Sequence, residues 1–523
     1  MKKLRKGMMV YEGFEYEVTA VYDEADEWLP AWDEQAELEI VGNPVPRIDG
    51  AKRVSGAARF TVDVQLPRML HAAVLRSTHA NARIESLDLE AARAAPGVRA
   101  VLGPSDAFGE GVPPLTDAPE YVGAPIAVIA AETVDAARAA LALLAPAYDA
   151  LPFEVDLDEG LRAQRFTMDP VENLRGEPES FARGAVRAQL EVETQFHVQS
   201  PLEPHAAVAD WQEDGLTVWS STQAIFAVRK ELAGRFGLPP ARVRVIAEVV
   251  GGGFGSKVEV AGDAVIAAEL SRRTRRPVSL VFTRHEEQLV GGHRPATKQT
   301  VRLAANTDGT LFASELDCVI GMGTGGMFPP VHGPAMFAYG SPNAQAMRFP
   351  VKLNLRPVNA FRGPGYVEGT TAYEQAVDEL AAALSLDPIE LRRRMHVDHD
   401  QSTGRPYSAK SLLACYDRAA ELSGWATRDR LRESGEDGLL RGLGCATQMW
   451  FGSAGPAAEC TIRIGVDGIA TVVTGIQDIG TGTLTAAQMV AAEELGLPLE
   501  RIRVIGGDTG PGVVSPTAGG SVS

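Results

Sequence analysis

The sequence predicts an α+β protein of several domains, and three observations support this prediction. Its 523 residues are too many for a single hydrophobic core. Segments of alternating apolar and polar residues, typical of strands, are interspersed with segments of helical apolar spacing. Hydrophobic residues make up 45% and charged residues 23%, the balance of a globular chain. We therefore expect three or four domains or subdomains that mix helices with sheets.

Residues 1–41 form an acidic extension that is rich in aromatic side chains. Its composition favours a loosely ordered segment over the alternative, a docking arm for a partner subunit. The basic start is interrupted by Glu12, Glu15 and Glu17 where a secretory segment needs apolar residues, so it is not a signal peptide.

Residues 42–160 have the pattern of a compact α+β module. Residues 56–77 predict strands that are broken at Pro67, and residues 84–103 predict a strand, a helix, a Pro-Gly turn and a second strand. The alanine-rich residues 132–152 predict a helix that Thr133 caps and Pro146 ends. The polar segment 161–184, which follows this module, is interpreted as a linker. 

Two longer regions follow the linker, 185–400 and 401–523. In the first, strands are expected with a helix at 224–238 and a mostly helical segment at 366–396, whose second helix starts at Pro388. In the second, a hairpin turns at Asp467-Gly468 and a helix covers 484–497.

The composition excludes several classes of protein. A net charge of −18 is opposite in sign to a surface that binds nucleic-acid phosphates. No apolar run reaches membrane-spanning length. The four cysteines lack CxxC spacing and nearby histidines, so we expect reduced, buried thiols and neither a zinc site nor an iron–sulfur cluster. They are Cys318, Cys415, Cys445 and Cys460.

The stretch VGGGFGSK, residues 250–257, follows the strand expected at 242–250 and is the most unusual in the chain. Glycine loses more entropy on folding than other residues, so the run indicates unusual dihedrals or a close approach. A tight turn, a phosphate cradle and a backbone wall against a flat cofactor are the three interpretations. The P-loop spacing fails, because Ser256 and Lys257 after Gly255 are out of register, and the dinucleotide-binding glycine pattern fails too.

Four further loops of similar character lie at strand ends or between elements, where binding groups are usually displayed. Their backbone amides and hydroxyl or amide side chains suit one large, phosphate-bearing ligand. They are STQ (221–223), AFRGPG (360–365), QDIGTGT (477–483) and SPTAGGS (515–521).

Together with PVSLVFTRHEEQ (277–288) and the segment 374–395, these motifs resemble the molybdenum-binding subunit of the xanthine dehydrogenase and aldehyde oxidase family of molybdenum hydroxylases. The branch most similar contains bacterial isoquinoline and aldehyde oxidoreductases, and the resemblance runs from Val41 to the end. It implies an α/β-hammerhead-like domain over 42–160 and molybdopterin-binding subdomains over 185–400 and 401–523, the second of them cut short.

The resemblance implies roles for individual residues. Gln223 would hydrogen-bond the apical oxo ligand or the pterin, or else serve as a turn amide. Phe254 would stack near the substrate, with Gly253 and Gly255 leaving room for the cofactor, or else be a core side chain. Arg362 would lie beside the molybdenum or orient the substrate, or else be a buried arginine satisfied by loop carbonyls.

The loops 478–483 and 515–521 would hold the pterin pyrophosphate and the equatorial side of the metal, and no side chain would ligate molybdenum directly. Gly519 would donate a backbone amide, and Thr481 stands where many relatives carry a glutamine. The predicted cofactor contacts are Gly252, Gly253, Phe254, Gly255, Arg362, Asp478, Gly480, Thr481, Gly482, Thr483, Thr517, Ala518, Gly519 and Ser521.

The implied reaction is oxidative hydroxylation of an aldehyde or N-heterocyclic carbon, with water as the oxygen source. The family's general base is a glutamate in a GxGE-type motif downstream of 515–521, and the sequence ends at Ser523 before any such motif. Glu259 does not match the position of that base, and Val258 replaces a purine-binding glutamate, which favours an aldehyde or a less polar heterocycle. We expect this chain to be inactive alone; a non-catalytic molybdopterin-binding homologue is the alternative.

The resemblance also implies an iron–sulfur partner subunit, with a flavin subunit or a cytochrome as the next electron acceptor. The cofactor is expected to be molybdenum–molybdopterin, with the cytosine dinucleotide as one candidate form. The expected compartment is the cytoplasm, or the periplasm through a signal on another subunit. His205, His285 and His293 are expected to be ordinary hydrogen-bonded residues and not metal ligands.

Overall fold

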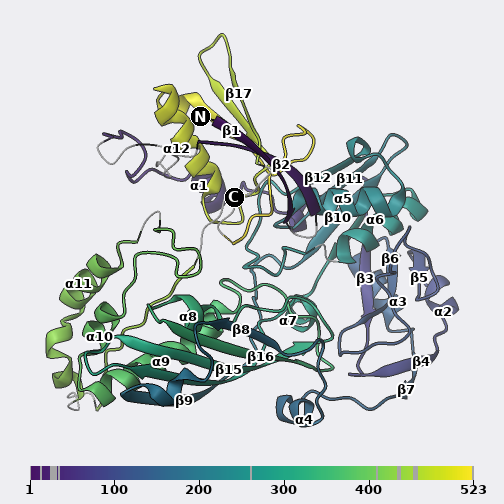
Figure 1. Cartoon of the computed structure of the whole chain (residues 1–523). Coiled ribbons are helices and arrows are strands. Elements are labelled where there is room, and N and C mark those ends of the chain that lie inside the picture. Colours follow the sequence, from purple (N-terminus) through teal and green to yellow (C-terminus); the bar gives the residue numbers. More distant parts are fainter. Residues whose placement is uncertain are drawn as a thin grey trace.

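The computed structural model describes residues 2–11, 14–23, 32, 36–259, 262–407, 410–432, 438–450 and 458–520. Three sheets of seven, five and three strands organise the chain, and helices cover their faces (Figure 1). Two additional pairs of strands are small: β1 (Lys2–Tyr11) with β2 (Phe14–Asp23), and β4 (Ala82–Ser86) with β7 (Ala147–Ala150).

The seven-stranded sheet has the strand order β12-β11-β10-β13-β3-β6-β5. Its strands are β3 (Leu70–Arg76), β5 (Val98–Leu102), β6 (Pro125–Ala131), β10 (Ala206–Trp211), β11 (Leu216–Ser220), β12 (Val243–Ile246) and β13 (Val278–Val281). Helices α5 (Ile225–Phe236) and α6 (Gly262–Thr274) share one apolar core with this sheet, and α2 (Glu90–Arg93) and α3 (Val134–Leu141) share another. Because β3 pairs in parallel with β13, segments 200 residues apart form one continuous sheet.

The five-stranded sheet has the order β8-β16-β15-β14-β9. Its strands are β8 (Val171–Arg175), β9 (Val186–Thr194), β14 (Thr297–Ala305), β15 (Leu311–Gly323) and β16 (Asn343–Lys352). Helices α8 (Gly333–Phe337), α9 (Tyr366–Leu384) and α10 (Pro388–Arg394) contribute apolar side chains to its core. Around it lie α4 (Leu157–Arg162), α7 (Arg284–Val290) and α11 (Leu412–Ser423).

The three-stranded sheet belongs to the C-terminal part of the chain and has the order β17-β18-β19. It consists of β17 (Cys460–Ile464), β18 (Ala470–Thr474) and β19 (Ile502–Ile505), packed against α12 (Thr483–Leu495). The short helix α1 (Gly50–Val54) lies near it (Figure 1). The predicted hairpin at Asp467-Gly468 is confirmed as the turn between β17 and β18.

Several sequence predictions of local structure are confirmed. Helix α5 occupies the predicted segment 224–238, and Pro388 is the first residue of α10. The strand, helix and strand predicted for 84–103 are β4, α2 and β5. Helix α3 is capped by Thr133, whose hydroxyl accepts a hydrogen bond from the backbone N–H of Ala136 at 3.1 Å.

Other local predictions were wrong. Residues 56–77 contain one strand, β3, because Asp63 closes a 3₁₀ turn at Thr61–Asp63 by accepting the backbone N–H of Phe60. Helix α3 ends at Leu141, short of Pro146, since the backbone N–H groups of Leu143 and Leu144 form i→i−3 bonds instead. 

Two segments expected to lack regular structure contain strands. The expected linker 161–184 contains β8, an edge strand that pairs with β16. The acidic extension contains the antiparallel pair β1 and β2, and the backbone N–H groups of Glu39, Ile40 and Val41 donate to the Glu493 carboxylate of α12 at 2.7–3.1 Å. The composition of residues 1–41 could not predict these hydrogen bonds, because Glu493 is about 450 positions away in the sequence.

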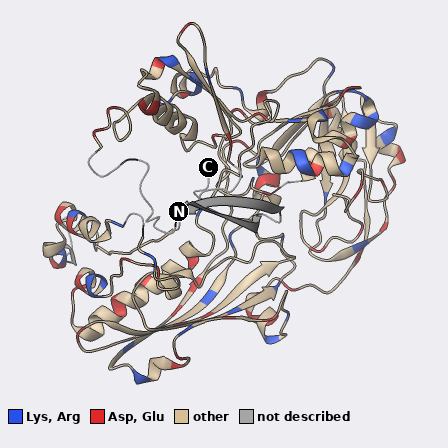
Figure 2. Ribbon diagram, turned by 45° about the horizontal axis from the view of Figure 1, so that its top comes forward, with Lys and Arg blue, Asp and Glu red and all other residues tan. Residues whose placement is uncertain are grey.

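Charges of both signs are interspersed over the helices and strands that Figure 2 colours. The cysteines form no disulfide, but only Cys318 is buried; Cys415 and Cys460 are exposed, contrary to the expectation of four buried thiols. No helix within the described residues combines the length and the apolar composition needed to cross a membrane.

Candidate functional site

The glycine loop, residues 250–257, leaves the end of β12 in an unusual backbone conformation. Gly252 and Gly255 have φ of +91° and +104°, values that side chains with a Cβ rarely adopt. Phe254 has φ of 55° although it carries a side chain, and 41% of its surface is exposed. Phe254 is therefore not the core phenylalanine of the alternative interpretation; its ring stands at the surface of the loop.

Gln223 joins this loop to two others. Its Oε1 accepts the backbone N–H of Gly255 at 2.8 Å, and its Nε2 donates to the carbonyl of Ala518 at 2.6 Å. Its own backbone N–H donates to the carbonyl of Lys257, and its carbonyl accepts the backbone N–H of Ala518, both at 2.8 Å. The side chain is 2% exposed. One buried amide thus holds the STQ, glycine and 515–521 loops together.

The resemblance implied that Gly253 and Gly255 leave room for the cofactor, but protein atoms occupy the space beside both glycines. A Cβ on Gly253 would overlap Oε1 of Gln223, and a Cβ on Gly255 would overlap the carbonyl oxygen of Ala360. These glycines allow protein loops to approach each other. Gly480 and Gly520, in contrast, are exposed, and an added Cβ at either would meet no atom within 4 Å.

A layer of buried polar side chains, Glu203, Lys257 and His205, packs against the glycine loop. The Glu203 carboxylate accepts the backbone N–H groups of Gly251 and Thr61 at 2.7 and 2.9 Å. The Lys257 ammonium donates to the carbonyl of Glu203 at 2.8 Å and lies 3.7 Å from its carboxylate. Burial lowers the pKa of Lys257, and the negative charge of Glu203 opposes this shift. 

His205 completes the layer. Its Nδ1 lies 3.0 Å from the Glu287 carboxylate and its Nε2 lies 3.1 Å from the carbonyl of Ser256. Burial acts to raise the pKa of Glu287, but the hydrogen bonds and charge of His205 outweigh it, and that pKa is lowered. His205 is thus a hydrogen-bonded structural residue, as predicted.

The AFRG loop is held by an arginine that sequence reasoning missed. The Arg294 guanidinium donates to the carbonyls of Phe361 and Arg362 at 2.6 and 3.0 Å and pairs with the buried Glu368. Arg362 itself is exposed, and its backbone N–H donates to the carbonyl of Phe254 at 2.9 Å. The alternative of a buried Arg362 is therefore wrong. The sequence offers little indication of this role, because the tripeptide His293-Arg294-Pro295 before β14 has no unusual composition.

The 478–483 loop is folded around its own aspartate. Asp478 accepts the backbone N–H groups of Gly480 and Gly482 at 2.8 and 3.2 Å. Arg47, from far upstream, donates to the carbonyl of Gly480 at 2.9 Å and lies 3.5 Å from the Asp478 carboxylate. The Thr481 hydroxyl, which is exposed, lies 2.8 Å from the hydroxyl of Thr483.

In the 515–520 segment, Thr517 and Ala518 are buried and Gly519 is half-buried. The Trp450 indole N–H donates to the carbonyl of Gly520 at 3.2 Å. Ser521, predicted as a contact, lies outside the described residues. 

Gln477 is an unsatisfied polar residue in the middle of these loops. It is 1% exposed, its Nε2 donates to the carbonyl of Gln223, and its Oε1 has no hydrogen-bond partner. A buried amide oxygen without a partner is costly unless a ligand or water donates to it. This atom fits a site for a polar ligand with hydrogen-bond donors.

Other predicted features lie at the rim or elsewhere. Glu259, at the end of the glycine loop, is exposed, and the half-buried Val258 faces Gly519. Burial lowers the pKa of His293 to about 3, so this residue is neutral; His285 is exposed. Within the described residues, no group of three or more His, Cys, Asp or Glu side chains is arranged to hold a metal.

A further contact joins β12 to the segment after β19. Arg244 forms two hydrogen bonds with Asp508, at 2.6 and 3.0 Å. Burial acts to raise the pKa of Asp508, but Arg244 and the backbone N–H of Gly510 outweigh it, so this pKa lies below its ordinary value.

We expect Asp508→Asn to lower the free energy of unfolding by about 1 kcal/mol at neutral pH, since Arg244 is half exposed to solvent. A depressed carboxyl pKa stabilises the fold above its unfolded value and stops doing so as pH falls through the folded value. The melting temperatures of the native chain and the variant should therefore differ by a constant amount from neutral pH to about 5, begin to converge near the ordinary Asp pKa of about 4, and coincide only below the depressed pKa of Asp508. A difference that persists at the acidic end would contradict the charged pair.

Comparison with known proteins covers most of the chain. Residues 55–152 match the a/b hammerhead domain of aldehyde oxidase and xanthine dehydrogenase, and residues 164–396 and 418–523 match molybdopterin cofactor-binding domains. The aldehyde oxidoreductase molybdenum-binding subunit PaoC of Escherichia coli (strain K12) is 33% identical over 90% of this chain. The nicotine 6-hydroxylase large subunit of Paenarthrobacter nicotinovorans is 28% identical over the same share.

Among solved structures, quinoline 2-oxidoreductase from Pseudomonas putida 86 superposes with a TM-score of 0.85 at 26% identity, over 90% of this chain and 67% of that one. The aldehyde oxidoreductase from Desulfovibrio gigas, at 23% identity and a TM-score of 0.77, shares the fold. The chain spans 66% of the length of PaoC and 64% of the length of the nicotine 6-hydroxylase subunit.

Proposed function

This chain belongs to the molybdenum-binding subunits of the xanthine dehydrogenase and aldehyde oxidase family, and we propose that it forms the cofactor-binding part of a hydroxylase for aldehydes or N-heterocycles. The observation that best supports the proposal is the convergence of three loops on the buried Gln223. The two substrate classes are taken from the names of similar proteins: the aldehyde oxidoreductase subunit PaoC, the nicotine 6-hydroxylase subunit and quinoline 2-oxidoreductase. Val258 favours aldehydes or less polar heterocycles over purines.

The residues present fit a molybdenum–molybdopterin group, because the buried Gln477 Oε1 has no partner where the loops meet at Gln223, and the 478–483 and 515–520 loops expose Gly480 and Gly520. When bound, that group would supply the oxidising power for hydroxylation of carbon with water. We propose the predicted contacts other than Gly253 and Gly255 as its cradle, with backbone amides of the 478–483 and 515–520 loops binding the anionic part. The cytosine dinucleotide form remains part of the proposal.

The chain's own residues would position the substrate and shape the site. Phe254, exposed on a strained loop, would offer its ring to an aromatic or apolar substrate. Arg362, exposed beside it and joined to it by a backbone hydrogen bond, would orient a substrate oxygen or ring nitrogen. Gln223 would keep both at fixed distance from the cofactor loops. 

We propose that the general base comes from a carboxylate outside residues 1–523, in the third of the relatives' length that this chain does not match. Electrons would pass to an iron–sulfur subunit. The same proposal includes domain boundaries near residues 160, 185 and 400. It also includes a cytoplasmic location.

Elemental analysis tests the cofactor assignment. We expect near-stoichiometric molybdenum in the full-length gene product, co-expressed with its neighbouring subunits in a molybdate-replete host. The ratio of phosphorus to molybdenum should double if the pterin carries a dinucleotide tail. Folded protein without molybdenum would contradict the proposal. Molybdenum-loaded protein that turns over neither aldehydes nor heterocycles would leave the alternative, a non-catalytic homologue.

A further inference from the structure

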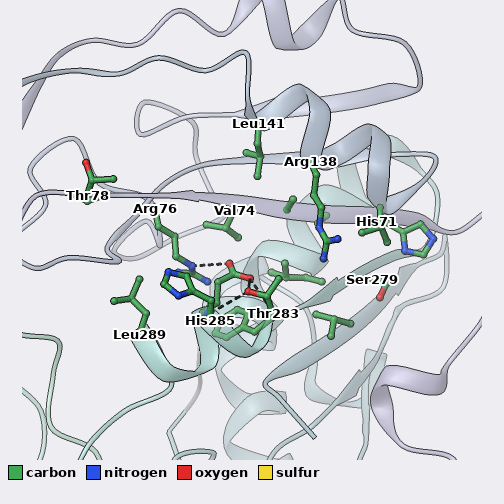
Figure 3. Close-up of a pocket in the computed structure, with 18 of the residues that line it drawn as sticks. His71, Val74, Arg76, Thr78, Arg138, Leu141, Ser279, Thr283, His285 and Leu289 are labelled. Carbon is green, nitrogen blue, oxygen red and sulfur yellow. Dashed lines mark hydrogen bonds and ion pairs between the residues drawn. The ribbon is translucent and has the colours of Figure 1, made fainter. Parts of the chain in front are cut away.

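A cavity of about 620 Å³ lies over the pair of strands β3 and β13 of the seven-stranded sheet, between α3 and α7 (Figure 3). Its volume lies within the range of roughly 300–1,000 Å³ that is typical of small-molecule sites. The floor comes from β3 and β13, whose parallel pairing places His71 directly beside Ser279. None of the lining residues belongs to the glycine-rich loops described above.

One wall carries a cation without a partner. Helix α3 presents Val134, Arg138 and Leu141 to the cavity at the i, i+4 and i+7 spacing of a single helix face. The Arg138 guanidinium points from α3 toward the strands (Figure 3), and no described residue forms an ion pair or hydrogen bond with it. Its charge is therefore available to a ligand.

The floor below Arg138 also holds unused polar groups. Ser279 is 8% exposed, and its hydroxyl has no hydrogen-bond partner among the described residues. His71, its neighbour in the sheet, is half-buried, and burial lowers its pKa. At neutral pH a neutral imidazole and a hydroxyl can each donate one hydrogen bond to an acceptor placed between them and Arg138.

The opposite end of the cavity is already neutralised. Glu286, the only acidic lining residue, pairs with Arg76 at 2.8 Å and accepts the backbone N–H of Thr283 at 2.8 Å as part of a capping box. Arg76 also lies over the ring of Phe282. With this pair balanced, Arg138 leaves the cavity with a positive excess, although the whole chain carries a charge of −18.

The remaining lining is apolar. Ala73 and Val281 on the floor, Leu141 on α3 and Leu289 on α7 give a surface for a hydrocarbon or aromatic group. A cavity with a hydrophobic body and a few convergent polar groups at one end is the usual form of a site for a small amphiphilic ligand.

We propose that this cavity binds a small organic monocarboxylate, with the carboxylate on Arg138, Ser279 and His71 and the hydrocarbon or aromatic body on Leu141 and Val281. Arg138 is exposed at the cavity wall, and a guanidinium and a carboxylate form charge-assisted hydrogen bonds, which are stronger than hydrogen bonds between neutral groups. This site is separate from the proposed cofactor cradle and does not depend on it.

The test uses para-fluorobenzoate and fluorine NMR on the intact chain. We expect saturable line broadening in the millimolar range or below, which unlabelled benzoate reverses, and weaker binding of the neutral para-fluorobenzamide. Arg138→Gln should raise the Kd for the acid by at least about tenfold and leave the Kd for the amide nearly unchanged, because only the charge-assisted contact is lost.

Two further variants keep the test decisive. Leu141→Trp should fill the apolar half of the cavity and remove binding of both the acid and the amide. Arg93→Gln, which changes an exposed arginine of α2 outside the cavity, should leave binding unchanged. Absence of saturable binding, or equal binding of the acid to the native chain and to the Arg138 and Leu141 variants, would overturn the proposal.

Discussion

Lys257→Met is expected to lower the free energy of unfolding by about 3–5 kcal/mol, the usual cost of removing one partner of a buried ion pair. The ammonium is fully buried beneath the glycine loop, and its removal leaves the Glu203 carboxylate without a counterion. The methionine side chain has a similar length, so lost packing contributes little. Chemical unfolding with a probe in the seven-stranded sheet measures the change.

The double variant Glu203→Gln, Lys257→Met removes both charges. Its loss of stability should be smaller than the sum of the two single losses, because each single change leaves an unpaired charge and the double change leaves none. The partly exposed pair Arg302–Asp317 provides the control, and Arg302→Met should cost no more than about 1 kcal/mol. Additive losses at Glu203 and Lys257 would show that the two charges do not interact.

Gly253→Ala is expected to displace Gln223 and with it the junction of the three loops. The added Cβ would overlap Oε1 of Gln223, and the backbone of Gly253 has no positive φ, so the effect is purely one of contact. We expect a loss of about 1–3 kcal/mol, typical of overpacking. Under the proposed function, molybdenum per folded chain should also fall severalfold.

Gly234→Ala is the matched control for this change. Gly234 lies within α5, and an added Cβ there meets no atom within 4 Å. Alanine should stabilise that helix by about 0.5–1 kcal/mol and leave molybdenum content unchanged. If Gly253→Ala retained full molybdenum and native stability, Gln223 would not be the residue that holds the loops in place.

Much of the local structure was predictable from short-range patterns. Helix α5 and the β17–β18 hairpin follow from apolar spacing and from Asp467-Gly468. Some of the failures depend on distant residues. The turn at Thr61–Asp63, which Asp63 closes locally, is also held by Glu203, 142 positions away, whose carboxylate accepts the backbone N–H of Thr61. A hydrogen bond between such distant residues has no local periodicity to reveal it.

The candidate site divides in the same way. The glycine loop, Gln223 and the 478–483 loop stand out in the sequence because their composition is unusual for regular structure. The residues that hold them do not: Arg294 satisfies the AFRG carbonyls and Arg47 contacts the 478–483 loop, yet each is one of many arginines. The sequence also assigned the wrong reason to Gly253, whose missing side chain admits Gln223.

By itself, the sequence determined the class of fold, the positions of α2, α3, α5, α9, α10, α12 and the β17–β18 hairpin, the family and the loops of the candidate site, because these depend on neighbouring residues and on motifs in order. Only the tertiary structure decided which loops meet at Gln223, that β3 and β13 join into one sheet, and that a cavity with an unpaired Arg138 lies at their seam. Such features arise from packing between segments that lie far apart in the sequence, and no local pattern records which of these segments meet.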